Sequence, residues 1–278
     1  MQKLISIILP TYNGSKWIIN AVESVIAQSY TDWELLVLDD GSNDSTELIV
    51  SQIAQNDPRV RYLKNEENLG IQKTLNKGIN ESKGEYIARI DDDDRWTDIN
   101  KLKNQVAFLE ENKDYVLIGT GAILIDEEGK ELSKFLMPQK DKDIRRKILS
   151  KNCFIHSSVL FRKEVALIVG GYDESGDTRH VEDYDLWLNL GTKGKFANLG
   201  SYSVSLMQRE GTISNSNRIN QAKRVLVLIR KFKNIYLNFR IGYSVSVARL
   251  VFFSLQKVTP FSNKLLYKIK TVYKKSNF

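Results

Sequence analysis

The 278-residue sequence contains one cysteine, Cys153, so no intramolecular disulfide can form and a reducing compartment is expected. Neither a G-x-G-x-x-G pattern after the first apolar run nor a GK[ST] loop occurs, which removes the main support for a dinucleotide or P-loop site. Two apolar runs near the C-terminus, 225–229 and 244–255, are shorter than the roughly 18–20 uninterrupted residues that a membrane-spanning helix needs.

Acidic residues are absent after Glu210, whereas 14 Lys and Arg side chains lie between Arg218 and Lys275. Because the whole chain carries +7, residues 1–210 carry −7. A basic segment interleaved with Tyr, Phe and Leu suits nucleic acid, an anionic lipid surface, or a solvated helical extension. We therefore expect residues 215–278 to form a basic amphipathic helical tail.

The rest of the chain alternates apolar runs of strand length with segments that have apolar residues at helical spacing. The first run is read as a buried strand and not as a signal peptide, because it is too short. Strands are expected at 4–9, 33–40, 59–64, 84–90 and 115–120, and helices at 15–28, 46–55, 70–82 and 98–111. This alternation predicts an α/β fold with a mainly parallel, twisted sheet and helices on both faces.

The second half is less regular. It predicts a hairpin at 122–136, a helix at 141–150 and a strand at 156–163. A Gly- and Asp-rich mobile loop is expected at 170–180 and a further helix at 182–191.

Polar clusters follow three of the expected strands: PTYNG at 10–14, DDGSNDST at 39–46 and DDDDRW at 91–96. In parallel α/β sheets, ligands bind outside the carboxyl ends of the strands. The three clusters are therefore expected to face one crevice.

The four adjacent acids, Asp91 to Asp94, repel one another, so they form either a solvated turn or a cation site. A hard cation, Mg²⁺ or Mn²⁺, that bridges carboxylate and phosphate oxygens would relieve the repulsion. Asp91 and Asp93 alternate along the chain and suit such a site, with Asp92 and Asp94 in support. The residues alone leave both interpretations open.

Other candidates also have both a functional and a structural interpretation. The 39–46 loop can approach a ligand or simply cap a helix, and Lys73 can contact phosphate or lie on the surface. Glu182 and Asp183 occupy the first turn of a helix, which favours acids, yet either is a candidate general base. His156 is a candidate substrate contact or a structural residue.

The order of these motifs resembles the family 2 glycosyltransferases of the GT-A fold, which is Rossmann-like. The resemblance runs from about Ile5 to Ser214, most of the chain. The motifs that carry it, in order, are ISIILPTYNG, VLDDGSNDST, NLGIQKTLN, GEYIARIDDDD, HSSVLFRK, GGYDE and VEDYDLWL.

The resemblance implies roles for individual residues. Asp93, with Asp91, corresponds to the D-x-D pair that holds Mn²⁺ or Mg²⁺, and Asp183 corresponds to the catalytic base. The acceptor region is implied to include Glu182, Trp187 and His156. Donor binding is implied for Pro10, Thr11, Tyr12, Asp40, Lys73, Asp91, Asp92, Arg209 and Ser214. Many relatives have a histidine in the segment that contains Arg209 and Ser214, and this sequence has no histidine in that segment.

The implied activity is inverting, metal-dependent transfer of a sugar from a nucleotide sugar, UDP-hexose or UDP-N-acetylhexosamine, to a saccharide hydroxyl. The acceptor is expected on a polyprenyl diphosphate, in O-antigen, capsule or exopolysaccharide synthesis. Residues 1–214 would form the GT-A domain, with 1–120 on the nucleotide side and 121–214 on the acceptor side.

For such an enzyme the lipid interpretation of the tail is favoured over nucleic acid, with a cytoplasmic protein bound peripherally to the inner face of the membrane. Two alternatives belong to other classes. A nucleotidyltransferase of similar fold should have a Gly- and Arg/Lys-rich loop after the first strand. A non-catalytic module that binds a sugar nucleotide or a membrane would not need both the acid cluster and the Glu182–Asp183 pair.

Overall fold

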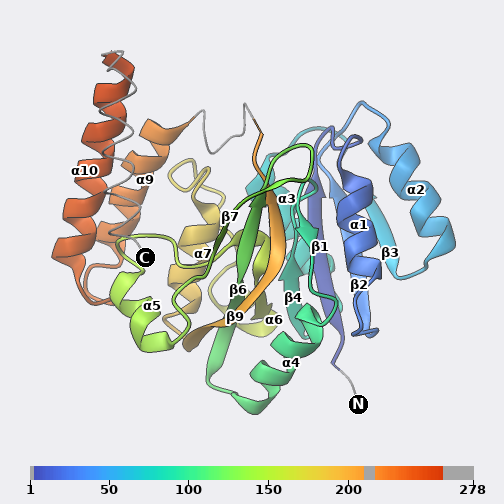
Figure 1. Cartoon of the computed structure of the whole chain (residues 1–278), viewed down its shortest axis with the longest axis horizontal. Helices are drawn as coiled ribbons and strands as arrows, with labels where there is room; N and C mark the ends of the chain where they lie inside the picture. Colours follow the sequence, from blue (N-terminus) through green and yellow to red (C-terminus); the bar gives the residue numbers. More distant parts are fainter. Residues whose placement is uncertain (1–2, 210–216, 259–278) are drawn as a thin grey trace.

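The computed structural model describes residues 3–209 and 217–258. A central sheet has helices on both faces (Figure 1). Its strands are β1 Ile5–Thr11, β2 Trp33–Asp39, β3 Val60–Lys64, β4 Tyr86–Arg89, β5 Arg95–Trp96, β6 Tyr115–Ile125, β7 Glu131–Phe135, β8 Leu160–Arg162 and β9 Lys195–Met207. The helices are α1 Ile18–Ile26, α2 Thr46–Asn56, α3 Ile71–Glu81, α4 Lys101–Glu111, α5 Asp141–Lys147, the 3₁₀ turn η1 His156–Ser158, α6 Lys163–Ile168, α7 Glu182–Leu190, α9 Arg218–Lys231 and α10 Phe239–Val258.

The described strands form one sheet in the order β3-β2-β1-β4-β8-β6-β9-β5, and β7 pairs with β6. The first four strands are parallel, as the alternation predicts. β8 runs antiparallel to both β4 and β6, and β5 runs antiparallel to β9. The predicted α/β fold is confirmed, and β6 and β9 add a further parallel pair in the second half of the chain.

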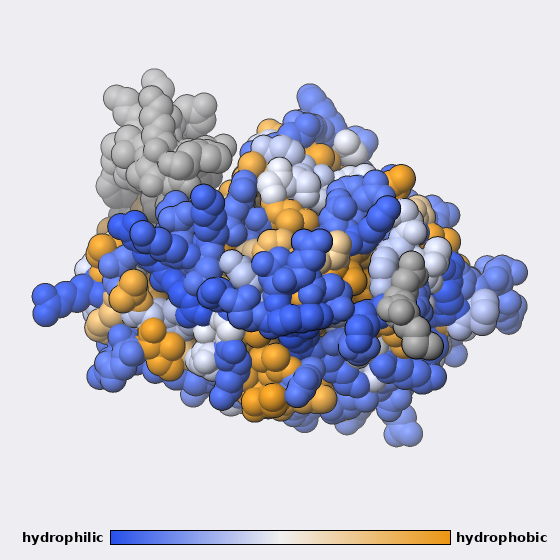
Figure 2. All heavy atoms as spheres, turned by 90° about the horizontal axis from the view of Figure 1, so that it is seen from below, coloured by the Kyte–Doolittle hydropathy of each residue, from blue (hydrophilic) through white to orange (hydrophobic). Residues whose placement is uncertain are grey.

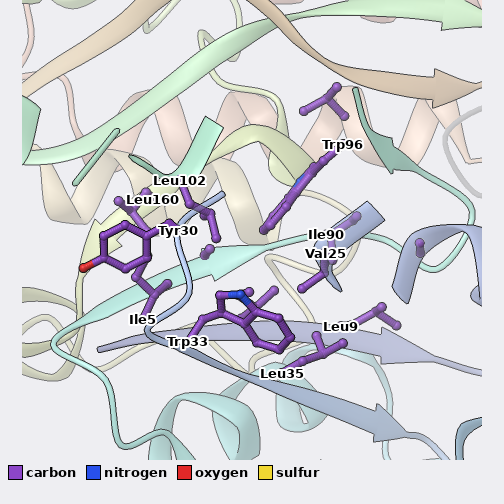
Figure 3. Packing of buried hydrophobic residues seen from close by; sticks show 14 of the residues in the cluster. Ile5, Leu9, Val25, Tyr30, Trp33, Leu35, Ile90, Trp96, Leu102 and Leu160 are labelled. Carbon is purple, nitrogen blue, oxygen red and sulfur yellow. The ribbon is translucent and has the colours of Figure 1, made fainter. Parts of the chain in front are cut away.

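Two hydrophobic clusters cover the two faces of this sheet. Successive side chains of a strand point to opposite faces, so Ile7 and Ile8 of β1 belong to different clusters. One cluster packs β1 and β2 against α1 and α4, and Figure 3 shows its interior around Trp33 and Leu9. The other packs Ile8 against α3 and extends to α7. Both faces are thus closed, which leaves the edge at the carboxyl ends of the strands for function.

The structure contains elements that the sequence pattern does not reveal. β5 is only two residues long, and β9 contains Gly, Asn and Ser residues that lower strand propensity. The strand expected at 156–163 is divided into η1 and the short β8. The hairpin around Gly129 is confirmed, since β6 and β7 pair and Gly129 has a positive φ of 82°.

The described part of the C-terminal segment packs against the body. Leu228 and Phe232 are buried in the second cluster, and the Tyr236 hydroxyl donates to the Leu188 carbonyl at 2.6 Å. α10 forms the outer edge beside α9 (Figure 1). The helical extension predicted after residue 214 therefore shares a core with the rest of the chain over its described length.

None of the described helices combines the length and the apolar character required to cross a bilayer. Figure 2 views the molecule from below, the side on which β1 begins, and shows a mainly hydrophilic surface with hydrophobic side chains in separate groups.

Candidate functional site

The polar clusters at the ends of β1, β2 and β4 contact one another, as expected from their position, and their facing one crevice stays a prediction. The Thr11 hydroxyl donates to Asp92 at 2.6 Å, joining the first loop to the third. The Asn13 amide donates to the Ser42 hydroxyl at 2.8 Å, joining the first loop to the second. A Cβ on Gly14 would lie 2.3 Å from Asp92 Oδ2, so a glycine is needed for the first contact.

Two arginines pair with two of the four acids. Arg89 of β4 is 1% exposed and its Nη2 lies 2.6 Å from Asp91 Oδ1. Arg209, just after β9, lies 2.7 Å from Asp93 Oδ2. The structure thus brings Arg209 to the acid cluster, and its contact with a diphosphate stays a prediction. Ser214, expected beside it, lies outside the described residues.

The other two acids point in different directions. Asp92 accepts the Thr11 hydroxyl, whereas Asp94 is buried, accepts the Ser157 hydroxyl and also accepts the Met207 amide at 3.3 Å. The Ser157 hydroxyl oxygen also lies 3.2 Å from Asp91 Oδ2. Ser157 therefore links two acids that are three positions apart.

Burial raises the pKa of Asp92 to about 6, with a further contribution from its acidic neighbours. Burial, followed by the charge of Asp91, raises the pKa of Asp93, and the pKa of Asp94 is raised for the same reasons. For Asp91, burial is outweighed by the charge of Arg89 and by the hydrogen bonds from Arg89 and Ser157, and the pKa is lowered. Negative charge in this loop is thus only partly compensated by protein groups.

A divalent cation fits this chemistry. Within residues 3–209 and 217–258, no three His, Cys, Asp or Glu side chains form a preassembled metal site. Magnesium, however, is commonly held by one or two carboxylates together with waters and substrate phosphates. Asp93 and Asp91 supply hard carboxylate oxygens, and the raised pKa of Asp93 and its neighbours indicates a surplus of negative charge that a cation would relieve.

Asp40, expected to contact the donor base, is buried among protein hydrogen-bond donors. Its Oδ1 accepts from Asn65 Nδ2, the Leu69 amide and the Thr74 hydroxyl at 2.8–2.9 Å, and its Oδ2 accepts from the Gly70 amide at 3.0 Å. Asp40 therefore fixes the loop that leads into α3, and its contact with a base stays a prediction.

The remaining donor-site candidates occupy the same edge. Pro10 is buried in β1, Tyr12 is exposed in the following loop, and Lys73 is exposed on α3. Asn76 of α3 holds the 170–180 loop, because its amide exchanges hydrogen bonds of 2.8 Å with the backbone of Tyr172. The loop expected to be mobile is thus anchored on one side.

Glu182 and Asp183 begin α7, as predicted. Asn152 Nδ2 donates to Asp183 Oδ2 at 2.8 Å. Burial raises the pKa of Asp183 to about 6, against the hydrogen bonds that favour its charge. Burial, followed by the charge of Asp183, raises the pKa of Glu182 to about 7. A carboxylate with a pKa near neutrality is suited to accept a proton.

His156 and Trp187, expected on the acceptor side, lie inside the protein and contact each other. Trp187 is fully buried, and its ring centroid lies 5.7 Å from that of His156. His156 Nε2 is 2.9 Å from the Tyr172 hydroxyl. Burial, with the charge of Arg89, lowers the pKa of His156 to about 3, so the imidazole is neutral. Trp187 has no exposed surface to offer an acceptor in this structure.

Sequence reasoning missed Arg89, Ser157 and Asn152. Arg89 lies at the centre of the site, since its charge acts on the pKa values of Asp91, His156 and Asp183. The available signal was an arginine in the otherwise apolar run YIARI, because a buried charge requires a partner.

The family model for glycosyl transferase family 2 matches residues 6–167. EpsE of Bacillus subtilis is 34% identical over 191 residues, which cover 68% of this chain and 67% of EpsE. The UDP-Glc:alpha-D-GlcNAc-diphosphoundecaprenol beta-1,3-glucosyltransferase WfgD of Escherichia coli is 32% identical over 223 residues, which cover 80% of this chain and 83% of WfgD.

Solved structures agree in fold. Staphylococcus aureus TarS 1-349 in complex with UDP-GlcNAc has a TM-score of 0.69 at 21% identity, covering 88% of this chain and 71% of TarS. The mannosyltransferase PcManGT from Pyrobaculum calidifontis, in complex with GDP-Man and Mn²⁺, has a TM-score of 0.63 at 18% identity, covering 96% and 79% of the two chains. The family match together with the shared GT-A fold establishes that the chain belongs to glycosyl transferase family 2 and is a glycosyltransferase.

Proposed function

We propose that the protein is an inverting, metal-dependent glycosyltransferase that moves a hexose or N-acetylhexosamine from a UDP-sugar to a saccharide hydroxyl in bacterial surface-polysaccharide synthesis. The observation that carries this proposal is Asp183, a carboxylate with a raised pKa at a helix start, within electrostatic reach of the acid loop through Asp91. TarS was solved with UDP-GlcNAc, and the name of WfgD specifies UDP-Glc, which supports a UDP-sugar donor.

In the proposed reaction, Asp183 removes the proton from the acceptor hydroxyl as its oxygen attacks the anomeric carbon. The new bond forms while the bond from that carbon to the diphosphate oxygen breaks, and UDP leaves with the bonding electrons. Attack from the face opposite the leaving group inverts the anomeric configuration. Asn152 orients the base for this step, since its amide holds one of the two carboxylate oxygens of Asp183.

The leaving diphosphate gains negative charge, and cationic groups at the acid loop can stabilise it. Asp93 and Asp91 would hold Mn²⁺ or Mg²⁺, which when bound neutralises diphosphate charge. Arg209 would contact a phosphate held at this loop, a role supported by its ion pair with Asp93. Thr11 and Asp40 keep the loops around the nucleotide in place.

The acceptor is proposed to be lipid-linked, as the name of WfgD specifies for that relative. Contact with an anionic membrane surface would use exposed apolar side chains of α10, where Ile241 is 58% exposed and Val251 is 51% exposed in a segment without acidic residues. Amphipathic helices with basic polar faces bind at such interfaces. The protein would then work peripherally on the cytoplasmic face of the membrane.

A screen of nucleotide sugars tests the proposal. We expect slow hydrolysis of one UDP-sugar to free UDP in the presence of Mn²⁺, measured by UDP release, with little release from GDP- or dTDP-sugars. Binding of UDP-sugars without any release, in the presence or absence of saccharide acceptors, would contradict the enzymatic assignment.

A further inference from the structure

A cavity of about 340 Å³ lies between the start of α7 and the two C-terminal helices. The body of the protein contributes Asp183 and Asn152 to its wall, whereas the acids of the 91–94 loop are not among its lining residues. The cavity is therefore reached by the proposed base but is separate from the proposed donor site.

The C-terminal helices add two basic side chains to the wall of this cavity. α9 contributes Arg218 and α10 contributes Arg249, and both helices belong to the part of the chain that has no acidic residue. The Arg218 guanidinium carbon lies 5.9 Å from the centre of the Phe253 ring, so an aromatic face supports the cation. Two guanidinium groups that line one cavity suit a phosphate or diphosphate, whose oxygens accept paired hydrogen bonds.

A second observation points to a ligand. Ser246 of α10 lines the same cavity and is 1% exposed, yet its hydroxyl has no hydrogen-bond partner within the described residues. Buried hydroxyl groups are nearly always paired, because an unpaired one loses its hydration without compensation. A ligand oxygen in the cavity would satisfy Ser246.

We propose that this cavity binds the phosphate or diphosphate of the acceptor, with Arg218, Arg249 and Ser246 as its ligands. The inference rests on the proposed function, since it places an anionic acceptor with its hydroxyl toward Asp183 in the same cavity. It assigns the selection of the acceptor to the C-terminal helices and the recognition of the donor to the loops of the sheet.

The same cavity also has an apolar side, formed by Val225 and Phe253. These side chains can cover the first carbons of a chain esterified to the diphosphate. The anion could therefore come from a lipid-linked acceptor or from a soluble phosphorylated saccharide, and the two sources differ in the use of this apolar side.

Calorimetric titration of the full-length protein with pyrophosphate tests the site. EDTA in the buffer removes any cation-dependent binding at the acid loop. We expect Arg218→Gln and Arg249→Gln each to weaken pyrophosphate binding about tenfold or more, because each removes a charge-assisted contact. Ser246→Ala should weaken it by a smaller factor, about threefold.

Matched controls come from the same two helices. Lys223→Gln on α9 and Arg240→Gln on α10 remove the same charge from exposed positions that do not line the cavity. Ser244→Ala removes an exposed hydroxyl two positions from Ser246. These three variants should bind pyrophosphate like the unmodified protein. Equal losses in all variants, or no binding by the unmodified protein, would overturn the proposal.

Farnesyl diphosphate distinguishes the two sources of the anion. Tighter binding of farnesyl diphosphate than of pyrophosphate, with Phe253→Ala removing the difference, supports a lipid-linked acceptor. Equal affinity supports a soluble phosphorylated acceptor at the same ligands. UDP affinity with Mn²⁺ should be unchanged in every Arg variant. If the protein transferred no sugar but still bound pyrophosphate through these arginines, the proposed function would be refuted. The proposed phosphate-binding cavity would still stand.

Discussion

Asn152 Nδ2 donates a 2.8 Å hydrogen bond to Asp183 Oδ2, so a residue before η1 fixes a carboxylate at the start of α7. The Asp183 carboxylate is buried enough that its pKa is raised to about 6. The hydrogen bond favours the charged form and the burial opposes it. The balance between these two effects sets the pH above which the Asp183 carboxyl is ionised and can accept a proton.

Asp183→Asn should lower the rate of sugar transfer about 10²–10⁴-fold, because it removes the proton acceptor. The affinity for UDP with Mn²⁺, measured by calorimetry, should stay within about twofold. Asp143→Asn is the matched control, since it is also a first-turn aspartate, in α5. Transfer at the original rate by Asp183→Asn would exclude Asp183 as the base.

The pH profile of kcat/KM should reflect the same carboxylate. Asp183 must be ionised to act as a base, so activity should fall as the pH drops below its pKa of about 6 and level off above it. Asn152→Ala removes a donor that stabilises the ionised form and should move the inflection to higher pH. An inflection that stays in place in Asn152→Ala would mean that another group titrates.

Folding stability gives an independent test of the raised pKa. A carboxyl group whose folded pKa is raised stabilises the fold below the pKa of the unfolded chain and loses that contribution as the pH rises through the folded value. Asp183→Asn should therefore keep or raise the melting temperature at pH 7, measured by calorimetry. A marked decrease would indicate that the charge of Asp183 is favourable for folding.

Chelation should abolish transfer, and Mn²⁺ or Mg²⁺ should restore it, because the acid loop is only partly neutralised by Arg89 and Arg209. Asp93→Asn should also remove the dependence of UDP affinity on Mn²⁺, a binding measurement that needs no turnover. Asp32→Asn, before β2 at the other edge of the sheet, serves as the control. Full activity in EDTA would rule out an essential ion.

Gly14→Ala should weaken donor binding about tenfold while the protein stays folded, because the new methyl group would lie 2.2 Å from Thr11 Oγ1 and 2.3 Å from Asp92 Oδ2. The circular dichroism spectrum should be unchanged. Gly176→Ala adds the same methyl group in open space and should have no effect. Unaltered UDP affinity in Gly14→Ala would separate the Thr11–Asp92 contact from donor binding.

Sedimentation with anionic liposomes tests the membrane contact. The double variant Ile241→Asp/Val251→Asp should remain in the supernatant, whereas the full-length protein should pellet at low salt. Leu48→Asp, at a position in α2 that is 62% exposed, is the control and should pellet normally. Removal of all residues after 215 is a poorer test, because it would uncover the core at Leu228 and Phe232.

The sequence predicts the N-terminal part of the sheet well, because β1 and β2 are short apolar runs followed by amphipathic helices. It does not reveal β9, whose hydrogen bonds depend on β6, a partner about 80 residues away. In the site, Asp183 and the acid cluster stand out through their residue types. Arg89 and Asn152 do not, because their importance arises only when the chain brings them to carboxylates.

The packing of α9 against α7 has a consequence for engineering. Lys231 of α9 lies 2.9 Å from Asp185 of α7, and Tyr236 caps the Leu188 carbonyl from the same side. The helix that carries the proposed base therefore packs both against the body of the protein and against the C-terminal segment. A chimera built to change acceptor preference should exchange α7, α9 and α10 together. If only α9 and α10 were exchanged, their new side chains would pack against an α7 surface that does not match them.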